Sequence, residues 1–134
     1  MRYLLDTNTC IAHLKSPPQS RVTRRLAEIE PGGAVLCSVV KAELIYGALR
    51  SREVDRNRRQ LDRFFGSLVS LPFDDRAAEA YGRIRSELAA MGTPIGPNDL
   101  MIAAIARAND LTLVTHNTSE FGRVPGLGIE DWEA

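Results

Sequence analysis

The stretch Tyr3-Leu4-Leu5-Asp6-Thr7-Asn8 decides how the chain begins to fold. Its first three residues form a short apolar run, and its last three are of types that favour helix caps and turns over strand interiors. This pattern predicts a short buried strand that leads directly into a helix. Asp6 then lies at the carboxyl end of the strand, where open α/β sheets place their ligands, although an aspartate here is also an ordinary helix cap.

The pattern of strand, turn and helix recurs along the chain. We expect further strands at 34–37, 68–72 and 111–115, and a short edge strand at 128–130. Helices are expected from residue 8 or 9 to the Pro17-Pro18 pair, then at about 19–30 and 38–49, around 61–68, and at about 74–91 and 97–108. Strands that alternate with helices predict an α/β fold with a mainly parallel sheet covered on both faces.

Capping residues and apolar spacing give these helices more detail. Asn8 or Thr9, Ser38 and Asp74 are expected as N-caps. One apolar stripe is predicted on the helix after Asp74, at Ala77, Tyr81, Ile84, Leu88 and Met91. The segment between the strand at 111–115 and the edge strand is expected to be a polar loop.

Two further acids stand near the starts of helices. Glu43 lies within the apolar segment 38–49, and Asp99 opens the helix at 97–108. Right-handed crossovers would gather Asp6, Glu43 and Asp99 at one edge of the sheet. Because like charges repel, such a group needs a cation, and Mg²⁺ or Mn²⁺ prefers oxygen ligands. We therefore expect these acids to be direct or water-mediated metal ligands in a site for phosphodiester hydrolysis.

The ordered set of motifs resembles the PIN domain. The motifs are Asp6-Thr7-Asn8 after the first strand, the Ser38-Val39-Val40-Lys41-Ala42-Glu43-Leu44 segment, Pro97-Asn98-Asp99, and Leu113-Val114-Thr115-His116-Asn117. The closing 120–127 segment and Glu130-Asp131-Trp132 are similar to the VapC toxins of bacterial toxin–antitoxin pairs. The resemblance runs along the whole chain. It implies a single PIN domain at 1–134, folded as a three-layer α/β/α sandwich with a short, mainly parallel sheet of four to five strands.

The resemblance also implies a function and a set of partners. The expected activity is that of a toxin, an Mg²⁺- or Mn²⁺-dependent endoribonuclease that cuts tRNA or rRNA and so inhibits translation. The expected partners are a cognate VapB antitoxin and a second copy of the chain, in a heterotetramer or larger complex. An antitoxin tail is expected to lie across the acidic edge and to place an Arg or Lys among Asp6, Glu43 and Asp99.

One position departs from the commonest PIN pattern. Asn117 stands where an acid usually follows the fourth strand, and its amide offers an oxygen ligand or a hold on a water molecule without adding charge. Glu120, three residues later, is a candidate for the missing charge, and a surface role remains open for it. Thr115 and Asn8 are expected to orient carboxylates or water behind the ligands. His116 is a candidate phosphate contact, and Trp132 is expected to pack the end of the chain.

Two alternatives remain open. Asp6-Thr7-Asn8-Thr9 after a strand also resembles the nucleophile motif of haloacid-dehalogenase-like phosphatases, but position 8 would then need a general acid and is Asn8. The other alternative is a PIN scaffold with weak or no catalytic activity that serves as an RNA-binding or interaction module. Asn117 favours this module, and the three acids oppose it because burying unpaired carboxylates for structure alone is costly.

Composition limits the other classes of protein. The 134 residues are 44% hydrophobic and 25% charged, which is ordinary for a globular domain, and 17 basic residues balance 17 acidic ones. The net charge therefore gives no general attraction to nucleic acid. Cys10 and Cys37 have neither metal-site nor disulfide-framework spacing. Because no segment has the pattern of a membrane span or signal peptide, we expect a cytoplasmic protein with no membrane partner.

Overall fold

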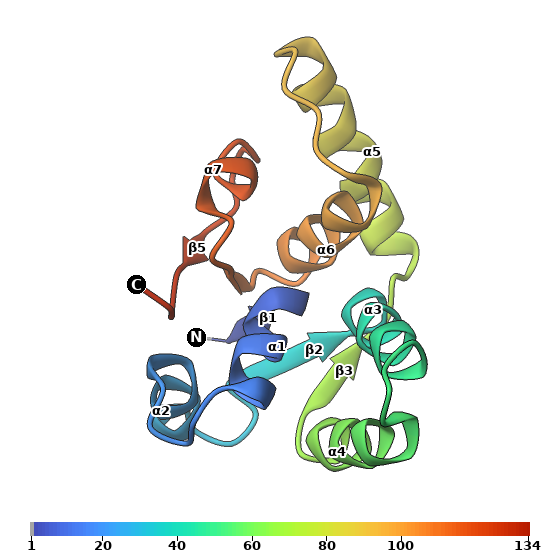
Figure 1. Cartoon of the computed structure of the whole chain (residues 1–134). Helices are drawn as coiled ribbons and strands as arrows, with labels where there is room; N and C mark the ends of the chain where they lie inside the picture. Colours follow the sequence, from blue (N-terminus) through green and yellow to red (C-terminus); the bar gives the residue numbers. More distant parts are fainter. Residues whose placement is uncertain (1) are drawn as a thin grey trace.

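The computed structural model describes residues 2–134 and contains a five-stranded sheet in the order β3-β2-β1-β4-β5 (Figure 1). The strands are β1 (Tyr3–Leu5), β2 (Ala34–Cys37), β3 (Val69–Leu71), β4 (Thr112–Val114) and β5 (Ile129–Glu130). Every neighbouring pair is parallel. The expected parallel sheet is therefore confirmed, including the edge strand β5.

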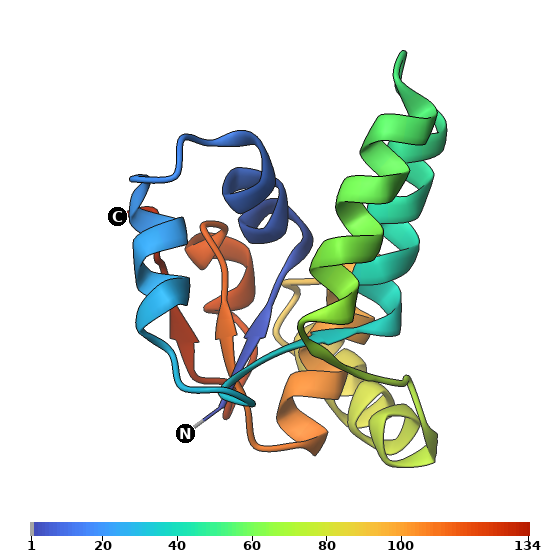
Figure 2. The same ribbon diagram turned by 90° about the horizontal axis from the view of Figure 1, so that it is seen from below.

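Seven helices connect the strands within the described residues. They are α1 (Thr7–Lys15), α2 (Arg21–Glu28), α3 (Ser38–Leu49), α4 (Val54–Gly66), α5 (Asp75–Ala90), α6 (Pro97–Ala108) and α7 (Thr118–Phe121). The chain passes from β1 to β2 to β3 through helices α1 to α4, towards one side edge of the sheet. It then passes from β3 to β4 to β5 through helices α5 to α7, in the opposite direction across the sheet. Because parallel connections are right-handed, the two groups of helices cover opposite faces of the sheet. Figures 1 and 2 show the resulting sandwich, with α3 and α4 side by side as a projecting hairpin.

The sheet is short but deeply buried, as a parallel sheet between two helical layers should be. All four residues of β2 are buried, and Leu4 and Leu5 of β1 are almost inaccessible to solvent. Helix α6 is buried along the run from Ile102 to Ala106, so it forms the centre of one layer. None of the helices described in residues 2–134 is both long and apolar enough to cross a membrane.

Several local expectations are wrong. Asp6, not Asn8 or Thr9, is the N-cap of α1, and Ser38 is the first residue of α3, whose N-cap Cys37 makes no side-chain cap bond. Met91 does not extend the apolar stripe of α5, because it follows the last helical turn and is 53% exposed. The expected polar loop after β4 contains the short helix α7, whose Phe121 is fully buried.

The cap of α5 gives a test of the fold that leaves the acidic edge untouched. The Asp74 side chain accepts a 3.0 Å hydrogen bond from the backbone N–H of Ala77, as expected of an N-cap. Asp74→Ala should lower the free energy of unfolding by about 1 kcal/mol, and Asp74→Asn by much less because asparagine also caps helices. Urea denaturation measures both. Equal losses in the two variants would contradict the capping role.

Candidate metal centre

The crevice between the carboxyl ends of β1 and β4 is the topological switch point of this sheet. The helices that follow these two neighbouring strands leave towards opposite faces, which opens a crevice where parallel α/β sheets place ligands. The Val114 carbonyl accepts hydrogen bonds from the Asp6 N–H at 3.1 Å and from Thr9 Oγ1 at 3.2 Å. These bonds fix the start of α1 against the end of β4.

Asp6 has two roles at this point. Its Oδ1 accepts a 2.8 Å hydrogen bond from the backbone N–H of Thr9, which caps α1. The residue is 5% exposed and lines a cavity at the sheet edge. Asp6 can therefore be both the helix cap and a metal ligand, because the cap uses only Oδ1 and orients the carboxylate.

Glu43 lies in the second turn of α3 and is oriented by a neighbour from α1. Its Oε1 accepts a 2.6 Å hydrogen bond from the hydroxyl of Thr7. The sequence interpretation did not assign a role to Thr7. Its position directly after Asp6, in the first turn of α1, was the signal that could have identified it as a partner for a second acid.

Asp99 stands in the first turn of α6 beside Glu120, which comes from α7. Burial, and next a hydrogen bond with the Glu120 carboxylate, raise the pKa of Asp99 to about 6, and the negative charges of Glu120, Glu43 and Asp6 add to this rise. Burial and the surrounding negative charges thus both disfavour the ionised form of this carboxyl group. The electrostatics of the edge therefore favour a bound cation.

The four predicted catalytic residues meet in one cavity of about 90 Å³. Its lining comes from the end of β1 and the start of α1, from α3 and α6, and from the turn after β4 together with α7. The lining residues are Asp6, Thr7, Asn8, Glu43, Asp99, Asn117 and Phe121. Asn8 is exposed at its mouth, and Phe121 is a buried apolar wall that the sequence interpretation did not identify. The expected convergence of Asp6, Glu43 and Asp99 is thus present in the structure.

Asn117 and Glu120 form a unit beside this cavity. The amide Nδ2 of Asn117 donates a 2.9 Å hydrogen bond to Glu120 Oε2, and the backbone N–H of Gly96 donates to Oε1 at 3.2 Å. The Asn117 bond is the largest of several interactions that lower the pKa of Glu120. Thr115 is fully buried, and its hydroxyl accepts a 3.0 Å bond from the Asn117 N–H. The structure therefore brings a fourth carboxylate next to Asp99.

The donor set of this cavity fits a hard divalent cation. Its chemistry-bearing side chains offer carboxylate and amide oxygens, with no sulfur or imidazole among the lining residues. Such oxygen ligands suit Mg²⁺ or Mn²⁺ rather than softer metals. A cation of charge +2 would also favour the ionised form of Asp99 and so oppose the rise of its pKa.

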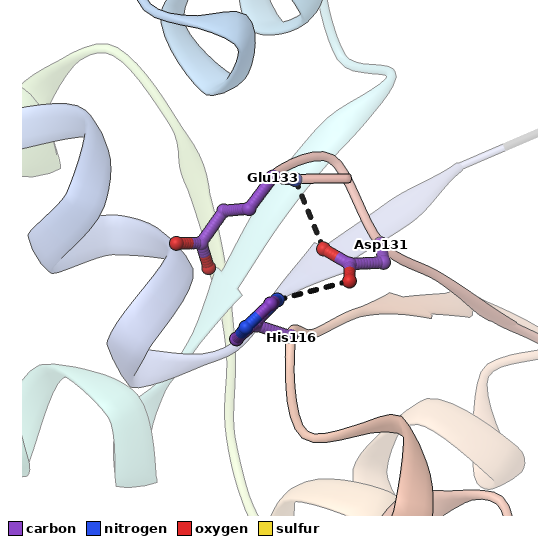
Figure 3. Close-up of side chains that lie close together, drawn as sticks. All are labelled: His116, Asp131 and Glu133. Atoms are coloured by element: carbon purple, nitrogen blue, oxygen red, sulfur yellow. Dashed lines mark hydrogen bonds and ion pairs between the residues drawn. The ribbon is translucent and has the colours of Figure 1, made fainter.

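A second group of potential ligands lies at the same sheet edge, beyond β4. Ligand atoms of His116, Asp131 and Glu133 lie within 4.8 Å of one another (Figure 3). His116 Nδ1 is 2.9 Å from Asp131 Oδ2, and the Asp131 hydrogen bond is the largest of several effects that raise the pKa of His116. His116 is not among the residues that line the acidic cavity.

Comparison with known proteins gives one consistent family. The sequence-family model of the PIN domain matches residues 3–127. The chain is 42% identical to the tRNA(fMet)-specific endonuclease VapC of Salmonella typhimurium and 43% identical to that of Shigella flexneri, and each alignment covers 98% of both chains. The crystal structure of VapBC2 from Rickettsia felis bound to a DNA fragment from their promoter matches with a TM-score of 0.92 and 37% identity. That match covers 98% of this chain and 99% of the other.

These matches span the segment that carries the acidic cavity and agree with the fold and the order of its motifs. The chain therefore belongs to the PIN-domain family and, within it, to the VapC ribonucleases of toxin–antitoxin systems.

Proposed function

We propose that this chain is the toxin of a type II toxin–antitoxin pair and cuts tRNA by hydrolysis that depends on Mg²⁺ or Mn²⁺ held at Asp6, Glu43 and Asp99. The observation that carries the proposal is the convergence of these three carboxylates on one cavity of about 90 Å³. PIN-domain nucleases in general depend on divalent metals, and the choice of Mg²⁺, with Mn²⁺ as a substitute, follows from the all-oxygen donor set.

Each side chain at the cavity has a distinct task under this proposal. A cation bound here would acidify a water for attack on phosphorus and would stabilise charge on the phosphate oxygens. Asp6, Glu43 and Asp99 hold it, and the Thr7 hydroxyl keeps Glu43 turned towards it. Phe121 limits the water that can enter from one side, which strengthens the electrostatic interactions within.

The residues behind the ligands maintain the charge of the site. The Asn117 amide and the Gly96 N–H hold the Glu120 carboxylate beside Asp99, and Thr115 holds the Asn117 backbone. Asn8 lines the mouth of the cavity and can orient a water or a substrate oxygen there. Under this proposal Glu120 supplies the charge that Asn117 lacks.

The two alternatives lose their support. The inactive-module interpretation depended on the missing charge at Asn117, and Glu120 provides a carboxylate hydrogen-bonded to Asp99. A haloacid-dehalogenase-like phosphatase is excluded because the chain belongs to the PIN family and has an exposed asparagine at position 8.

The substrate class and partners come from the relatives. The Salmonella and Shigella relatives are named for tRNA(fMet), and we propose initiator tRNA as the first candidate substrate. We propose that a cognate VapB antitoxin binds the chain, and that the chain forms a homodimer within a heterotetramer or larger complex. We also propose that it acts on RNA in the cytoplasm.

The large apolar side chains of Tyr46 and Leu49 on α3 are 61% and 59% exposed. We expect a partner chain to cover this part of the surface. We also propose that residues 1–134 act as one PIN domain.

The nuclease proposal predicts metal-dependent cuts at discrete positions. The purified chain, freed of antitoxin, is incubated with total cellular RNA in Mg²⁺ or Mn²⁺, and new RNA ends are mapped. EDTA and Asp99→Asn should each reduce cleavage by at least about 100-fold, because EDTA removes the cation and the substitution removes one of its charged ligands. The control Asp55→Asn removes an exposed carboxylate from the first turn of α4 and should cut normally.

Two results would contradict this prediction. Cleavage that persists in EDTA would exclude a metal-dependent reaction. A folded, metal-bound chain that cuts no RNA would exclude the nuclease function and favour the alternative of an RNA-binding or interaction module.

The raised pKa of Asp99 predicts how stability depends on pH without metal. The folded chain holds this proton more tightly than the unfolded chain does, so the carboxylate destabilises the fold above pH 6, and this cost vanishes as the pH falls towards 4. Asp99→Asn should therefore raise the free energy of unfolding by about 1 kcal/mol at pH 7.5, after allowance for solvent screening, and by almost nothing at pH 4. Denaturant titrations in EDTA measure this difference. An equal effect at both pH values would refute the electrostatic explanation.

The antitoxin hypothesis predicts a reversible growth defect. Expression of the chain alone should arrest bacterial growth, and co-expression of the neighbouring small open reading frame should relieve the arrest by covering the acidic edge. The Asp99→Asn chain serves as the control and should not arrest growth. Arrest that continues although the two proteins form a stable complex would count against inhibition at the acidic edge.

A further inference from the structure

A groove adjoins the metal centre along one face of α3. Its volume is about 640 Å³, within the range of about 300 to 1,000 Å³ that is typical of sites for small molecules. Thr7 and Glu43 line both this groove and the acidic cavity, and a 2.6 Å hydrogen bond joins them. A group that occupies the groove therefore lies directly beside the proposed metal ligands.

Apolar side chains make up most of the remaining lining of the groove. Val39, Ala42 and Tyr46 follow one another on α3 at intervals of three and four residues, so they share a helix face with Glu43. Asn98 adds an exposed amide from the first turn of α6. None of the lining residues is basic. The groove therefore suits an uncharged group with a broad apolar face better than it suits a phosphate.

Tyr46 presents the largest apolar surface in this groove. Its side chain is 61% exposed. Arg50, one helical turn later, donates a 3.0 Å hydrogen bond from Nη1 to the Tyr46 hydroxyl and lies 5.4 Å from the centre of the ring. These contacts restrict the ring, so that less conformational entropy is lost when another group stacks on it. An exposed aromatic ring next to an arginine is a suitable platform for an unpaired nucleic-acid base.

An RNA substrate brings a base close to this ring when its cleaved phosphate lies at the acids. Tyr46 stands three residues after Glu43, a rise of about 4.5 Å along the axis of α3. A nucleotide next to the cleaved bond therefore spans the distance from the cavity to the groove. Bases in single-stranded loops are free to stack in this way, whereas those within a duplex are already paired and stacked.

We propose that the groove binds the base of a nucleotide that adjoins the cleaved bond, and that this base stacks on Tyr46. The Asn98 amide offers a donor and an acceptor to the edge of the base and so contributes to base selection. The inference rests on the proposed function, because it extends the same site from the cleaved phosphate to the neighbouring base. A partner chain that covers Tyr46 would then exclude the RNA base from the groove.

Tryptophan fluorescence can observe the stacking without cleavage. A chain that carries Tyr46→Trp and Asp99→Asn is titrated in EDTA with a short single-stranded RNA, whose base should quench the introduced indole. The natural Trp132 is 5% exposed and gives a constant background. Tyr81→Trp in the same background is the matched control. Tyr81 also accepts a hydrogen bond from an arginine one turn later, Arg85 at 3.2 Å, but it lies on α5 away from this groove, so its indole should not be quenched.

Binding of matched RNAs tests the contact itself. In the Asp99→Asn background, Tyr46→Ala should raise the Kd about tenfold for an RNA that carries the mapped cut site, and Tyr46→Phe, which keeps the ring, less than about twofold. Removal of the base from one of the two nucleotides that flank the cut should weaken binding similarly. The two losses should not add, because each removes the same contact.

Two further variants complete this experiment. Asn98→Ala should reduce the difference in Kd between RNAs that vary only in the stacked base. Met91→Ala removes another exposed apolar side chain, which follows α5, and should bind RNA normally. Urea denaturation of each variant excludes loss of folding as the cause of weaker binding.

Several outcomes would overturn the inference. An indole at position 46 that is not quenched while RNA binds, or one quenched no more than that at position 81, would exclude specific stacking. Additive losses from Tyr46→Ala and base removal would exclude a direct contact. Unchanged RNA binding by Tyr46→Ala, together with weaker self-association in sedimentation, would assign Tyr46 to the interface between two copies of the chain. RNA that stacks on position 46 but is not cut by the wild-type chain would instead contradict the proposed function alone.

Discussion

Repulsion among the carboxylates of Asp6, Glu43 and Asp99 in one small cavity determines how the neighbouring side chains are arranged. Two like charges about 4 Å apart cost about 4 kcal/mol at the effective dielectric of a protein surface. The chain reduces that cost with a backbone N–H on Asp6, a hydroxyl on Glu43 and an amide on Glu120. Burial and the remaining repulsion together raise the pKa of Asp99 to about 6.

The fold supplies the positive potential that makes this arrangement tolerable. Helices α1, α3 and α6 all begin near the cavity, and each presents its amino-terminal end, which carries partial positive charge, towards an acid in or next to its first turns. The parallel sheet makes this possible for α1 and α3, because each begins directly after a strand that ends at this edge, whereas α6 follows α5 and has its first turn at the same cavity. The acids are therefore held by the backbone geometry of regular elements and not by flexible loops.

Residue chemistry explains which parts of the site were predictable. Asp6, Glu43 and Asp99 could be identified because each acid interrupts an apolar segment at a strand end or helix start. The buried strands were equally clear from their apolar runs. Thr7 and Phe121 were missed because their roles depend on partners far along the chain, which spacing does not reveal. Helix α7 was missed because four residues are too short for a helical period.

The capping errors have a related cause. Asp6, Asn8 and Thr9 are all good N-cap types, so composition alone could not choose among them. The choice is made by the hydrogen bonds of Asp6 and Thr9 to Val114, more than 100 residues away. Ser38 is displaced from its cap position because β2 continues through Cys37, and Met91 lies beyond the helical turn that would have buried it.

The pairing of β1 with β4 also bears on how the protein is made. A nascent chain contains Asp6 from the start of synthesis, but it acquires Asp99 and Glu120 only after most of the domain has emerged from the ribosome. Until Thr112–Val114 is available, β1 lacks its neighbour on one side and the crevice does not exist. A growing chain therefore cannot form this crevice until β4 has emerged and paired with β1.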